Sequence, residues 1–562
     1  MAKVDIPGAK RAGLPVDLDR LTAEGDDWLS PEERYALKTH GVCAQTQPHV
    51  FMIRTRTSGG IVSADMARGL ARIADDHGKG WIHLTTRQQL QFHHVRARDV
   101  ATVLAEIGAV GLSTRSTCGH TLRGVMSCPD SGVGLDEPFD CYPDARAVSD
   151  SILARTPALN AQLPSRFNIC FGGCPACRDH AKTNEAGFVS TVRDGALGYE
   201  LWLGGSLGKS APTLAFKAAD FVARNDVLAA ANALLDVYIT YGNFDQPNKA
   251  RMKFLVRDLG RQRFLELFRA AYAEARERAW PEPTPVSAPE GSAVAGILAH
   301  APEGGWGSGV RPQRTPGLAL VTVNVPLGDI DSDDLRLLAD LSDEVADGNL
   351  CLTRNQNVMF RHVPVSAVPT VRRRLADVGL GLEGADQSLD VRVCTGGPVC
   401  TLAITPSQAV GARLLNSPAL VRNSGLRVHV SGCPNACAQH QAADLGFSGG
   451  KVTINGRAML GYQVWLGGDL RGGTLAQVVG RITEADVLAI TEAIVGLWEA
   501  LRVQGETLSD SVNRIGLQAL QAQIDAVFKG RWAPGPEPAD PGLPRLPQLL
   551  NLARSLPLAV AS

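Results

Sequence analysis

The chain contains an internal copy of itself, and this repeat constrains the fold more than any other feature. Residues 84–95 have the sequence LTTRQQLQFHHV, and residues 352–363 have LTRNQNVMFRHV without a gap. A second pair, LGYELWLGG at 197–205 and LGYQVWLGG at 460–468, follows in the same order. Two copies are too few for a solenoid, so the repeat predicts a pseudo-twofold protein.

The order of apolar patterns is the same in both copies. A β-rich run, at 50–56 and again at 318–325, precedes a helical pattern, a strand-like run and a second helical pattern. The strand-like runs are the 84–95 and 352–363 segments themselves. This β-α-β-α order predicts an α+β fold.

Composition limits the classes of function. The chain has 562 residues, 44% of them hydrophobic and 20% charged, which is enough for several packed domains. A formal net charge of −1 argues against a nucleic-acid partner. No apolar stretch has the length of a membrane span or a signal peptide, so we expect a cytoplasmic protein without a membrane partner.

Most of the 12 cysteines lie in two stretches, 118–177 and 351–437, and each stretch contains a Gly-Cys-Pro. Disulfides are disfavoured in a large chain without an export signal, so clustered cysteines indicate metal or redox chemistry. In the second stretch Cys394 and Cys400 form C-x5-C, and Cys433 and Cys437 form C-x3-C. Two close pairs suit a [4Fe–4S] cluster, because each iron takes one thiolate. A zinc site, which prefers shorter spacings, and buried free thiols are the alternatives.

At these residues the sequence resembles the sirohaem-dependent nitrite and sulfite reductase family. C-x5-C followed by C-x3-C is that family's cluster signature, and the duplicated halves and the LTTRQ segment agree with it. The resemblance implies a duplicated pseudo-twofold α+β fold with ferredoxin-like half-domains and two sirohaem-type α/β domains. The predicted bounds are a half-domain at 45–115, a sirohaem-type domain at 116–280, a Pro/Gly-rich linker at 281–316, a half-domain at 317–385, a [4Fe–4S]/sirohaem domain at 386–532 and a Pro-rich tail at 533–562.

The resemblance also implies the cofactors, a [4Fe–4S] cluster and sirohaem. Carried over, Cys394, Cys400, Cys433 and Cys437 are the cluster ligands, and Cys437 also bridges the cluster to the sirohaem iron. Histidines are less suitable for this role, so His93, His94, His180 and His440 are expected to be packed or surface residues.

Sirohaem carries many carboxylates and the substrate is an anion, so a buried site needs fixed cations. Arginine suits oxyanions because it stays charged and donates two hydrogen bonds. The family pattern places substrate-binding residues at Arg56, Arg123, Arg166 and Asn168, and sirohaem-binding residues at Arg87, Lys249 and Arg251. The alternatives are ordinary ones: a strand arginine is usually solvated or salt-bridged, Asn168 could cap a turn, and Lys249 and Arg251 could form a charged helix face.

The two copies differ in these cations. Asn355 occupies the position that matches Arg87, and the residues opposite Arg56 are neutral. We therefore expect that only one of the two pseudo-symmetric pockets binds a tetrapyrrole, which predicts one sirohaem per chain.

The first cysteine stretch lacks the C-x5-C spacing. Its cysteines could ligate a second cluster, but their spacing favours a vestige of the duplication. The residues concerned are Cys118, Cys128, Cys170, Cys174 and Cys177.

The resemblance implies six-electron reduction of a small oxyanion. Sulfite enzymes commonly have two lysines where this chain has Arg166 and Asn168, so the single cation favours nitrite, reduced to ammonium, over sulfite, reduced to sulfide. A precorrin-3B synthase-like monooxygenase and a non-catalytic cluster-binding subunit are further alternatives. No GxGxxG follows a strand and opens a helix, so we expect electrons from ferredoxin or a separate flavoprotein.

Overall fold

The computed structural model describes residues 4–156, 158–287, 294–303, 305–454, 456–527 and 532–534. The predicted tail at 533–562 lies outside these residues except for Ala533 and Pro534, and the predicted linker is described only in part. The chain divides into two compact units, Met1–Ala385 (unit 1) and Asp386–Ser562 (unit 2).

Unit 1 contains, among its described residues, two five-stranded sheets and one four-stranded sheet. The first has the order β1-β2-β5-β4-β12 and the second β10-β11-β14-β13-β3. Their strands are β1 (Val42–Ala44), β2 (Val50–Arg54), β3 (Ile61–Ser63), β4 (Trp81–Leu84), β5 (Leu90–Arg96), β10 (Val310–Pro312), β11 (Leu318–Val323), β12 (Asp329–Asp331), β13 (Asn349–Leu352) and β14 (Val358–Pro364).

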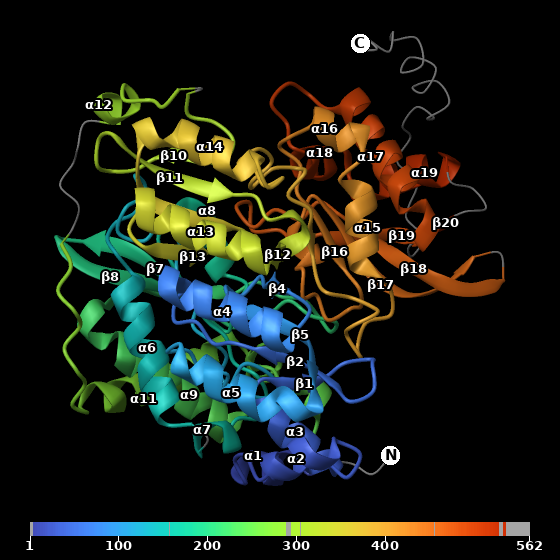
Figure 1. The fold of residues 1–562 in the computed structure, drawn as a ribbon. Helices are drawn as coiled ribbons and strands as arrows, with labels where there is room; N and C mark the ends of the chain where they lie inside the picture. Colours follow the sequence, from blue (N-terminus) through green and yellow to red (C-terminus); the bar gives the residue numbers. More distant parts are fainter. Residues whose placement is uncertain are drawn as a thin grey trace. The chain divides into compact units, whose positions relative to one another are not determined.

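Helices cover these two sheets and precede them (Figure 1). They are α1 (Ile6–Arg11), α2 (Leu18–Glu24), α3 (Pro31–Thr39), α4 (Ala64–His77), α5 (Val100–Ala109), α12 (Val294–Leu298), α13 (Ser332–Val345) and α14 (Val368–Ala376), with short 3₁₀ turns η1 (Ala97–Asp99), η4 (Pro326–Gly328) and η5 (Val365–Ala367). Two of these elements, α12 and β10, lie within the span predicted as a linker, and β10 adds an edge strand to the second sheet.

The two sheets exchange a strand. Strand β3 of the first copy pairs with β13 of the second, and β12 of the second copy pairs with β4 of the first. The hydrogen bonds around this exchange are reciprocal: Gln88 Nε2 donates to Leu352 O and Gln356 Nε2 donates to Leu84 O, both at 2.8 Å. The pseudo-twofold repeat is therefore built into the backbone pairing, and neither sheet is complete without the other copy.

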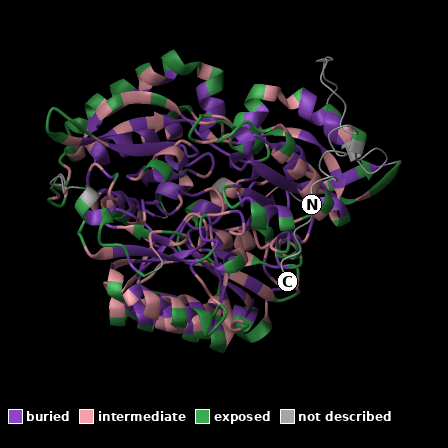
Figure 2. Cartoon of the chain, turned by 90° about the horizontal axis from the view of Figure 1, so that it is seen from above, coloured by how far each residue is buried: buried purple, intermediate pink, exposed green. Residues whose placement is uncertain are grey.

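One hydrophobic core serves both sheets. Helices α4 and α13 pack against each other (Figure 1), and their apolar faces, with Leu70 and Leu338 fully buried, join the same cluster as the strands. The Ser63 side chain caps α4 by accepting from the Met66 N–H at 3.2 Å. Figure 2 shows that the strands are largely buried, whereas exposed residues concentrate on the outer faces of helices.

The LTTRQQLQFHHV segment is a hairpin rather than one strand. Strand β4 ends at Leu84, β5 begins at Leu90, and the Thr85 N–H donates to Gln89 O at 2.9 Å across the turn. Gln88 has a φ of 56°, a left-handed conformation that is typical of turns. Arg87 is therefore at the tip of a tight loop.

The four-stranded sheet of unit 1 has the order β6-β7-β8-β9, and the six-stranded sheet of unit 2 has the order β15-β16-β17-β18-β19-β20. In both, the strand before the Gly-Cys-Pro pairs in parallel with the next strand. The strands are β6 (Ile169–Gly172), β7 (Ala186–Arg193), β8 (Ala196–Leu203), β9 (Phe216–Ala223), β15 (Arg392–Val393), β16 (Val428–Ser431), β17 (Leu445–Ile454), β18 (Arg457–Leu466), β19 (Gln477–Thr483) and β20 (Trp532–Pro534).

Their helices also correspond, with a long apolar helix (α9 and α17) in each. The helices of unit 1 are α6 (Tyr142–Ala154), α7 (Ala158–Ala161), α8 (Pro175–Ala181), α9 (Val227–Tyr241), α10 (Met252–Leu259) and α11 (Arg261–Arg276), with η2 (Arg224–Asp226) and η3 (Pro247–Lys249). Those of unit 2 are α15 (Ser407–Leu414), α16 (Pro418–Arg422), α17 (Val487–Leu501), α18 (Leu508–Ile515) and α19 (Leu517–Val527), with η6 (His440–Ala442) and η7 (Glu484–Asp486).

Candidate functional site

Three arginines predicted from the sequence come together in unit 1. Arg56 follows β2, Arg87 lies at the tip of the β4–β5 loop, and Arg123 lies in the long segment between α5 and α6. Each of Arg56 and Arg87 interacts electrostatically with Arg123. Three elements far apart in the sequence therefore bring the guanidinium groups of Arg56, Arg87 and Arg123 into one part of unit 1, the cation region.

The partners of these guanidinium groups are neutral. Arg56 Nη1 donates to Leu122 O at 3.1 Å, and Arg87 Nη2 donates to Gly124 O at 2.9 Å. Arg123 donates to the carbonyls of Thr117 and Gly119. All three Nε atoms are buried, and they have no hydrogen-bond partner among the described residues.

Burial makes these charges costly. It lowers the pKa of Arg56 to about 10 and of Arg87 to about 9, and the nearby Arg123 charge lowers both further. Burial also lowers the pKa of Arg123 itself. The carboxylates of Asp150, near Arg56, and Glu185, near Arg87, oppose this lowering only in part, and neither forms a hydrogen-bonded ion pair with these two arginines among the described contacts.

Arg166 and Asn168 lie immediately before β6, on the edge of the same region. The positive charges here also act on the His120 side chain. Burial lowers the pKa of His120 to about 4, and the charges of Lys10, Arg123 and Arg166 lower it further. Asn168 is 9% exposed, and its Oδ1 is buried without a hydrogen-bond partner among the described residues.

Arg251 and Lys249 separate in the structure. Arg251 forms a buried ion pair with Glu185, at 2.6 Å from its Nε, and interacts electrostatically with Arg87. Lys249, on η3, is exposed, and no described contact connects it to the arginines. Of the two, only Arg251 is positioned in the cation region.

Two further cations belong to this region although they were not among the predicted site residues. Lys253 on α10 is 6% exposed, and burial, with the Arg251 charge next, lowers its pKa to about 8. Lys10 on α1 donates to Leu163 O, and burial lowers its pKa to about 8 as well. Lys253 lies two residues after the predicted Arg251, which is its only sequence signal, whereas Lys10 precedes the predicted first domain.

The region has the chemistry that a polyanion requires. Buried guanidinium groups with unused N–H donors and lowered pKa values gain stability when an anion with several oxygens supplies the missing acceptors. Sirohaem carboxylates and a small oxyanion both have that chemistry. The residues present therefore fit an anionic cofactor and substrate.

The four cysteines of the second stretch lie together in unit 2. Cys433 interacts with both Cys400 and Cys437, and Cys394 interacts with Cys433. Burial raises the pKa of Cys433 to about 11, so its thiolate form needs a positive partner. Among these four sulfurs, no three lie within 4.8 Å of one another, so they are more widely spaced than the ligands of a single ion.

The loops that carry these cysteines have unusual backbone geometry. Gly396 has a φ of 56°, and a Cβ there would lie 2.2 Å from Ser407 Oγ, so only glycine fits. Ala436, next to Cys437, has a φ of 58°. The Gly432 N–H donates to Cys394 Sγ at 3.2 Å. Spaced thiols with N–H groups aimed at sulfur fit a [4Fe–4S] cluster, in which each ligand binds a different iron.

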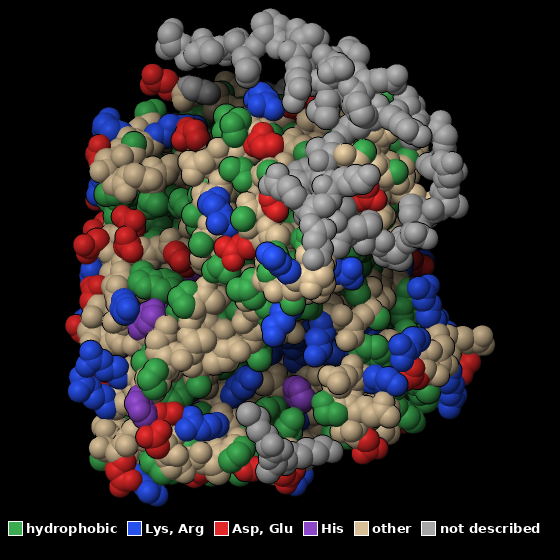
Figure 3. Space-filling model, turned by 90° about the vertical axis from the view of Figure 1, so that its right-hand side faces the viewer, with side chains coloured by type: hydrophobic (Ala, Val, Ile, Leu, Met, Phe, Trp, Pro, Cys, Tyr) green, Lys and Arg blue, Asp and Glu red, His purple; other side chains and the backbone are tan. Residues whose placement is uncertain are grey.

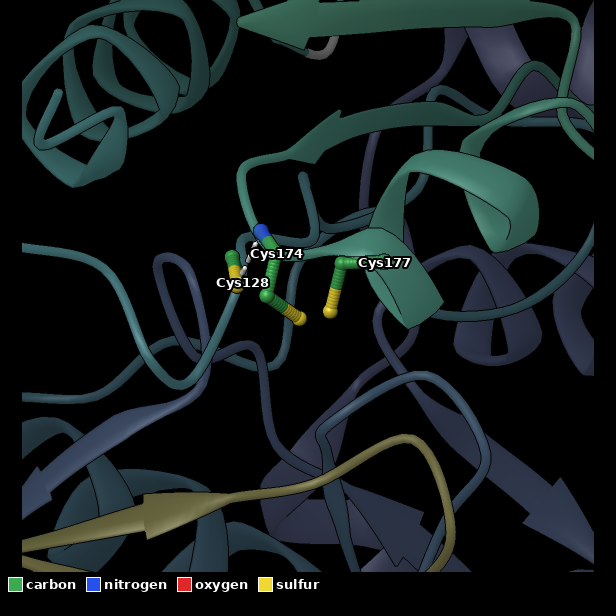
Figure 4. A group of neighbouring side chains, drawn as sticks. All are labelled: Cys128, Cys174 and Cys177. Carbon is green, nitrogen blue, oxygen red and sulfur yellow. Dashed lines mark hydrogen bonds between the residues drawn. The ribbon is translucent and has the colours of Figure 1, made fainter. Parts of the chain in front are cut away.

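The first-stretch cysteines divide into separate places. Cys118 lies beside Cys43, from β1, rather than beside Cys128. Cys170 is buried in β6 and interacts with Arg87. The other three, Cys128, Cys174 and Cys177, form a compact group (Figure 4).

Three of the four candidate histidines, His93, His180 and His440, are buried, whereas His94 is half-buried. His93 is 3% exposed and stacks on Trp81 with ring centroids 5.0 Å apart. His440 is fully buried against Trp465, and burial lowers its pKa to about 3.

Outside these sites the charge distribution is mixed. Figure 3 shows basic and acidic side chains interspersed over one face of the molecule, in agreement with a formal net charge of −1. Within the described part of the chain, every helix is too short or too polar to cross a membrane.

Comparison with known proteins adds independent evidence. The profile of the "Nitrite and sulphite reductase 4Fe-4S domain" matches residues 118–275 and 387–531. The profile of the "Nitrite/Sulfite reductase ferredoxin-like half domain" matches residues 44–110 and 311–378. Both profiles match twice, as the internal repeat predicts.

Individual relatives cover most of the chain. It is 29% identical to a ferredoxin–nitrite reductase of Synechococcus elongatus over 82% of its length and 88% of the relative. It is 28% identical to a ferredoxin sulfite reductase of Mycolicibacterium paratuberculosis, over 86% and 82%.

A solved structure extends the similarity to three dimensions. The Mycobacterium tuberculosis NirA protein superposes with a TM-score of 0.79 at 23% identity, covering 92% of this chain and 98% of that one. The duplicated fold, the paired profile matches and the cysteine spacing agree, and the chain belongs to the nitrite and sulfite reductase family.

Proposed function

We propose that this chain is a ferredoxin-dependent reductase that converts nitrite to ammonium. As a member of its family it is an oxidoreductase, and membership implies a [4Fe–4S] cluster and sirohaem. The choice of nitrite rests on one observation: Asn168, which stands where sulfite enzymes commonly have a second lysine, is buried and uncharged.

We assign the cofactor ligands residue by residue from the family pattern. Cys394, Cys400, Cys433 and Cys437 of unit 2 would hold the cluster, and Cys437 would also bind the sirohaem iron. Arg87 and Arg251 of unit 1 would bind sirohaem carboxylates, and Lys253 and Lys10 would add positive charge. Lys249 is a weaker candidate because it is exposed. When bound, the two cofactors would supply electrons to the substrate one at a time.

The chain's own residues would bind and orient the substrate. Arg56 and Arg123 are held by backbone carbonyls, so their free donors are preorganised and need not reorganise when an anion arrives. Arg166 adds a third charge. These donors would hold the substrate oxygens and stabilise negative charge as it develops, and they would direct protons towards the departing oxygens.

Asn168 would set the preference between substrates. Nitrite carries less negative charge than sulfite, so it needs fewer fixed cations. The unused Asn168 Oδ1 is an acceptor, and an acceptor disfavours a second negative charge close by. Ferredoxin is the proposed donor because the curated relatives that carry this name match over most of their length.

The test is anaerobic turnover with a chemically reduced dye, with nitrite and sulfite measured in parallel. We expect a kcat/KM for nitrite at least about tenfold higher, with ammonium as the product. Asn168→Lys should move the preference towards sulfite, while Asn168→Gln, the uncharged control, should not. A wild-type preference for sulfite, with sulfide as product, would contradict the proposal.

A further inference from the structure

The group of Cys128, Cys174 and Cys177 lies in unit 1. Their Sγ atoms all lie within 4.8 Å of one another (Figure 4). Cys174 precedes α8, Cys177 lies in its first turn, and Cys128 comes from the long segment between α5 and α6. Cys128 and Cys177 are 2% and 4% exposed, so the group is closed to solvent on those sides.

A carboxylate lies beside the three thiols. Glu137 is 3% exposed, and its Oε1 is buried without a hydrogen-bond partner among the described residues. A Cβ on Gly173 would lie 2.2 Å from that oxygen, which places it against the backbone just before Cys174. The carboxylate interacts with Cys128 and Cys174. The carboxylate therefore lies beside two of the three thiols, outside the group of three sulfurs itself, and is the candidate for a fourth ligand.

The sulfur separations select the kind of metal centre. Around one tetrahedral zinc ion, with Zn–S bonds of about 2.3 Å, sulfurs lie about 3.8 Å apart. In a [4Fe–4S] cluster each thiolate binds a different corner, so the sulfurs are farther apart. The Cys128 group is therefore compact enough for a single ion, unlike the four cysteines of unit 2.

The surroundings would stabilise thiolates. Arg354, from the β13–β14 loop, donates to Cys177 Sγ at 2.7 Å. The Cys174 N–H donates to Cys128 Sγ at 3.4 Å. Such outer contacts orient metal ligands and offset the negative charge that three thiolates and a carboxylate leave around a divalent ion.

We propose that Cys128, Cys174, Cys177 and Glu137 bind one zinc ion in a closed, structural site. Thiolates select zinc over magnesium and calcium, carboxylate oxygen is an accepted fourth ligand, and the C-x2-C spacing of Cys174 and Cys177 is that of a zinc knuckle. The ion would tie the segment between α5 and α6, which also carries Arg123, to the start of α8. The site is separate from the [4Fe–4S] ligands and needs no second cluster.

The first test is the metal content and zinc coordination of the purified, fully loaded enzyme. We expect about one zinc and about five irons per chain, the irons being those of one cluster and one sirohaem. X-ray absorption at the zinc edge should show three sulfurs at about 2.3 Å and one oxygen at about 2.0 Å. Absence of zinc, or about nine irons per chain, would overturn the proposal.

The second test uses variants. Cys177→Ser and Glu137→Gln should lower zinc occupancy at least about tenfold, because each removes one of four ligands, and should leave iron content unchanged. Cys351→Ser, a buried thiol outside the group, is the control and should retain zinc. If a variant fails to fold, the wild type is treated with a thiol-modifying reagent instead. A colorimetric chelator then measures whether zinc is released, as the proposed site requires. Full zinc retention in Cys177→Ser, or no zinc released from the wild type, would count against the site.

Discussion

The two Gly-Cys-Pro segments begin alike and continue differently. After Cys174 the chain enters α8, and Cys177 lies one turn away with its sulfur close to those of Cys128 and Cys174. After Cys433 the chain has one more residue before the next cysteine, Ala436 takes a left-handed conformation, and Cys437 is exposed. One added residue thus changes a compact thiol group, suited to one ion, into a spread set suited to a cluster.

The two loops that contain the LTTRQ repeat differ in a parallel way. The first places Arg87 among the buried cations, with Gly124 O as an acceptor. The second has Asn355 at that position and places Arg354, one residue earlier, against Cys177. The duplication therefore supplied two similar frameworks, and substitutions within them assigned anion binding to one and thiolate stabilisation to the other.

The largest effect should come from the exposed cysteine of unit 2. Cys437→Ser should lower nitrite turnover by about a thousand-fold, because it removes the proposed link between the electron-transferring centre and the site of reduction. Turnover with a reduced dye and the electron paramagnetic resonance of the cluster measure this. Cys351→Ser is the control, and near-normal turnover in Cys437→Ser would refute the bridging role.

The next largest effect should come from matching substitutions in the two repeated loops, which we expect to affect the enzyme differently. Arg87→Ala should reduce kcat/KM for nitrite about a hundred-fold and lower sirohaem content, since a buried donor to an anion is lost. Asn355→Ala, at the matching position of the other copy, should change neither by more than about twofold. Equal losses in both variants would mean that both loops serve the same site.

The spacing difference can be tested directly. Insertion of one residue between Pro175 and Ala176 converts C-x2-C to C-x3-C and should abolish zinc binding while iron content stays the same. Because a structural metal contributes folding free energy, the thermal midpoint should fall by roughly 5 °C. An insertion between Asp194 and Gly195, in the exposed β7–β8 turn, is the control. Unchanged zinc content would show that the spacing does not define the site.

The cation region should respond to pH. The pKa of Lys253 is lowered to about 8 by burial, with Arg251 and Arg166 lowering it and Glu185 opposing them. A bound polyanion favours the charged ammonium, so affinity is greatest below pH 8 and declines as Lys253 loses its proton above it. Titration of the sirohaem-free protein should show about tenfold weaker sirohaem binding at pH 9 than at pH 7. Lys253→Arg should remove most of this pH dependence of sirohaem binding. Equal affinity of the wild type at pH 7 and pH 9 would contradict the prediction.

The smallest effect concerns backbone strain beside Cys437. Ala436→Gly should stabilise unit 2 by about 0.5–1 kcal/mol. Glycine adopts the left-handed conformation without the penalty that a Cβ causes, and this gain exceeds the greater conformational entropy that glycine loses on folding. Denaturant unfolding followed by the cluster absorbance would show it. Ala438→Gly, whose φ is not positive, should destabilise instead; destabilisation by both substitutions would mean that Ala436 is not strained.

Much of this protein was predictable from its sequence, because the information is local or periodic. The repeat predicted the pseudo-twofold fold, since homologous segments fold alike, and the cysteine spacing indicated a cluster because ligand spacing reflects the geometry of a turn. Arg56, Arg87 and Arg123 followed from the family pattern, and in the structure the first two both interact with Arg123, while their roles stay proposals.

Other features depend on contacts between distant segments, and only the tertiary structure determined them. The strand exchange between the copies, the contribution of Lys10 and the burial of Lys253 have no periodic signal. The compact thiol group is the clearest case. Cys128 and Cys177 are far apart in sequence, and their spacing favoured a vestige, yet the fold brings their sulfurs within reach of one ion and places Glu137 beside Cys128. Sequence spacing constrains ligands on one turn, whereas ligands from separate segments meet only when the chain between them has folded.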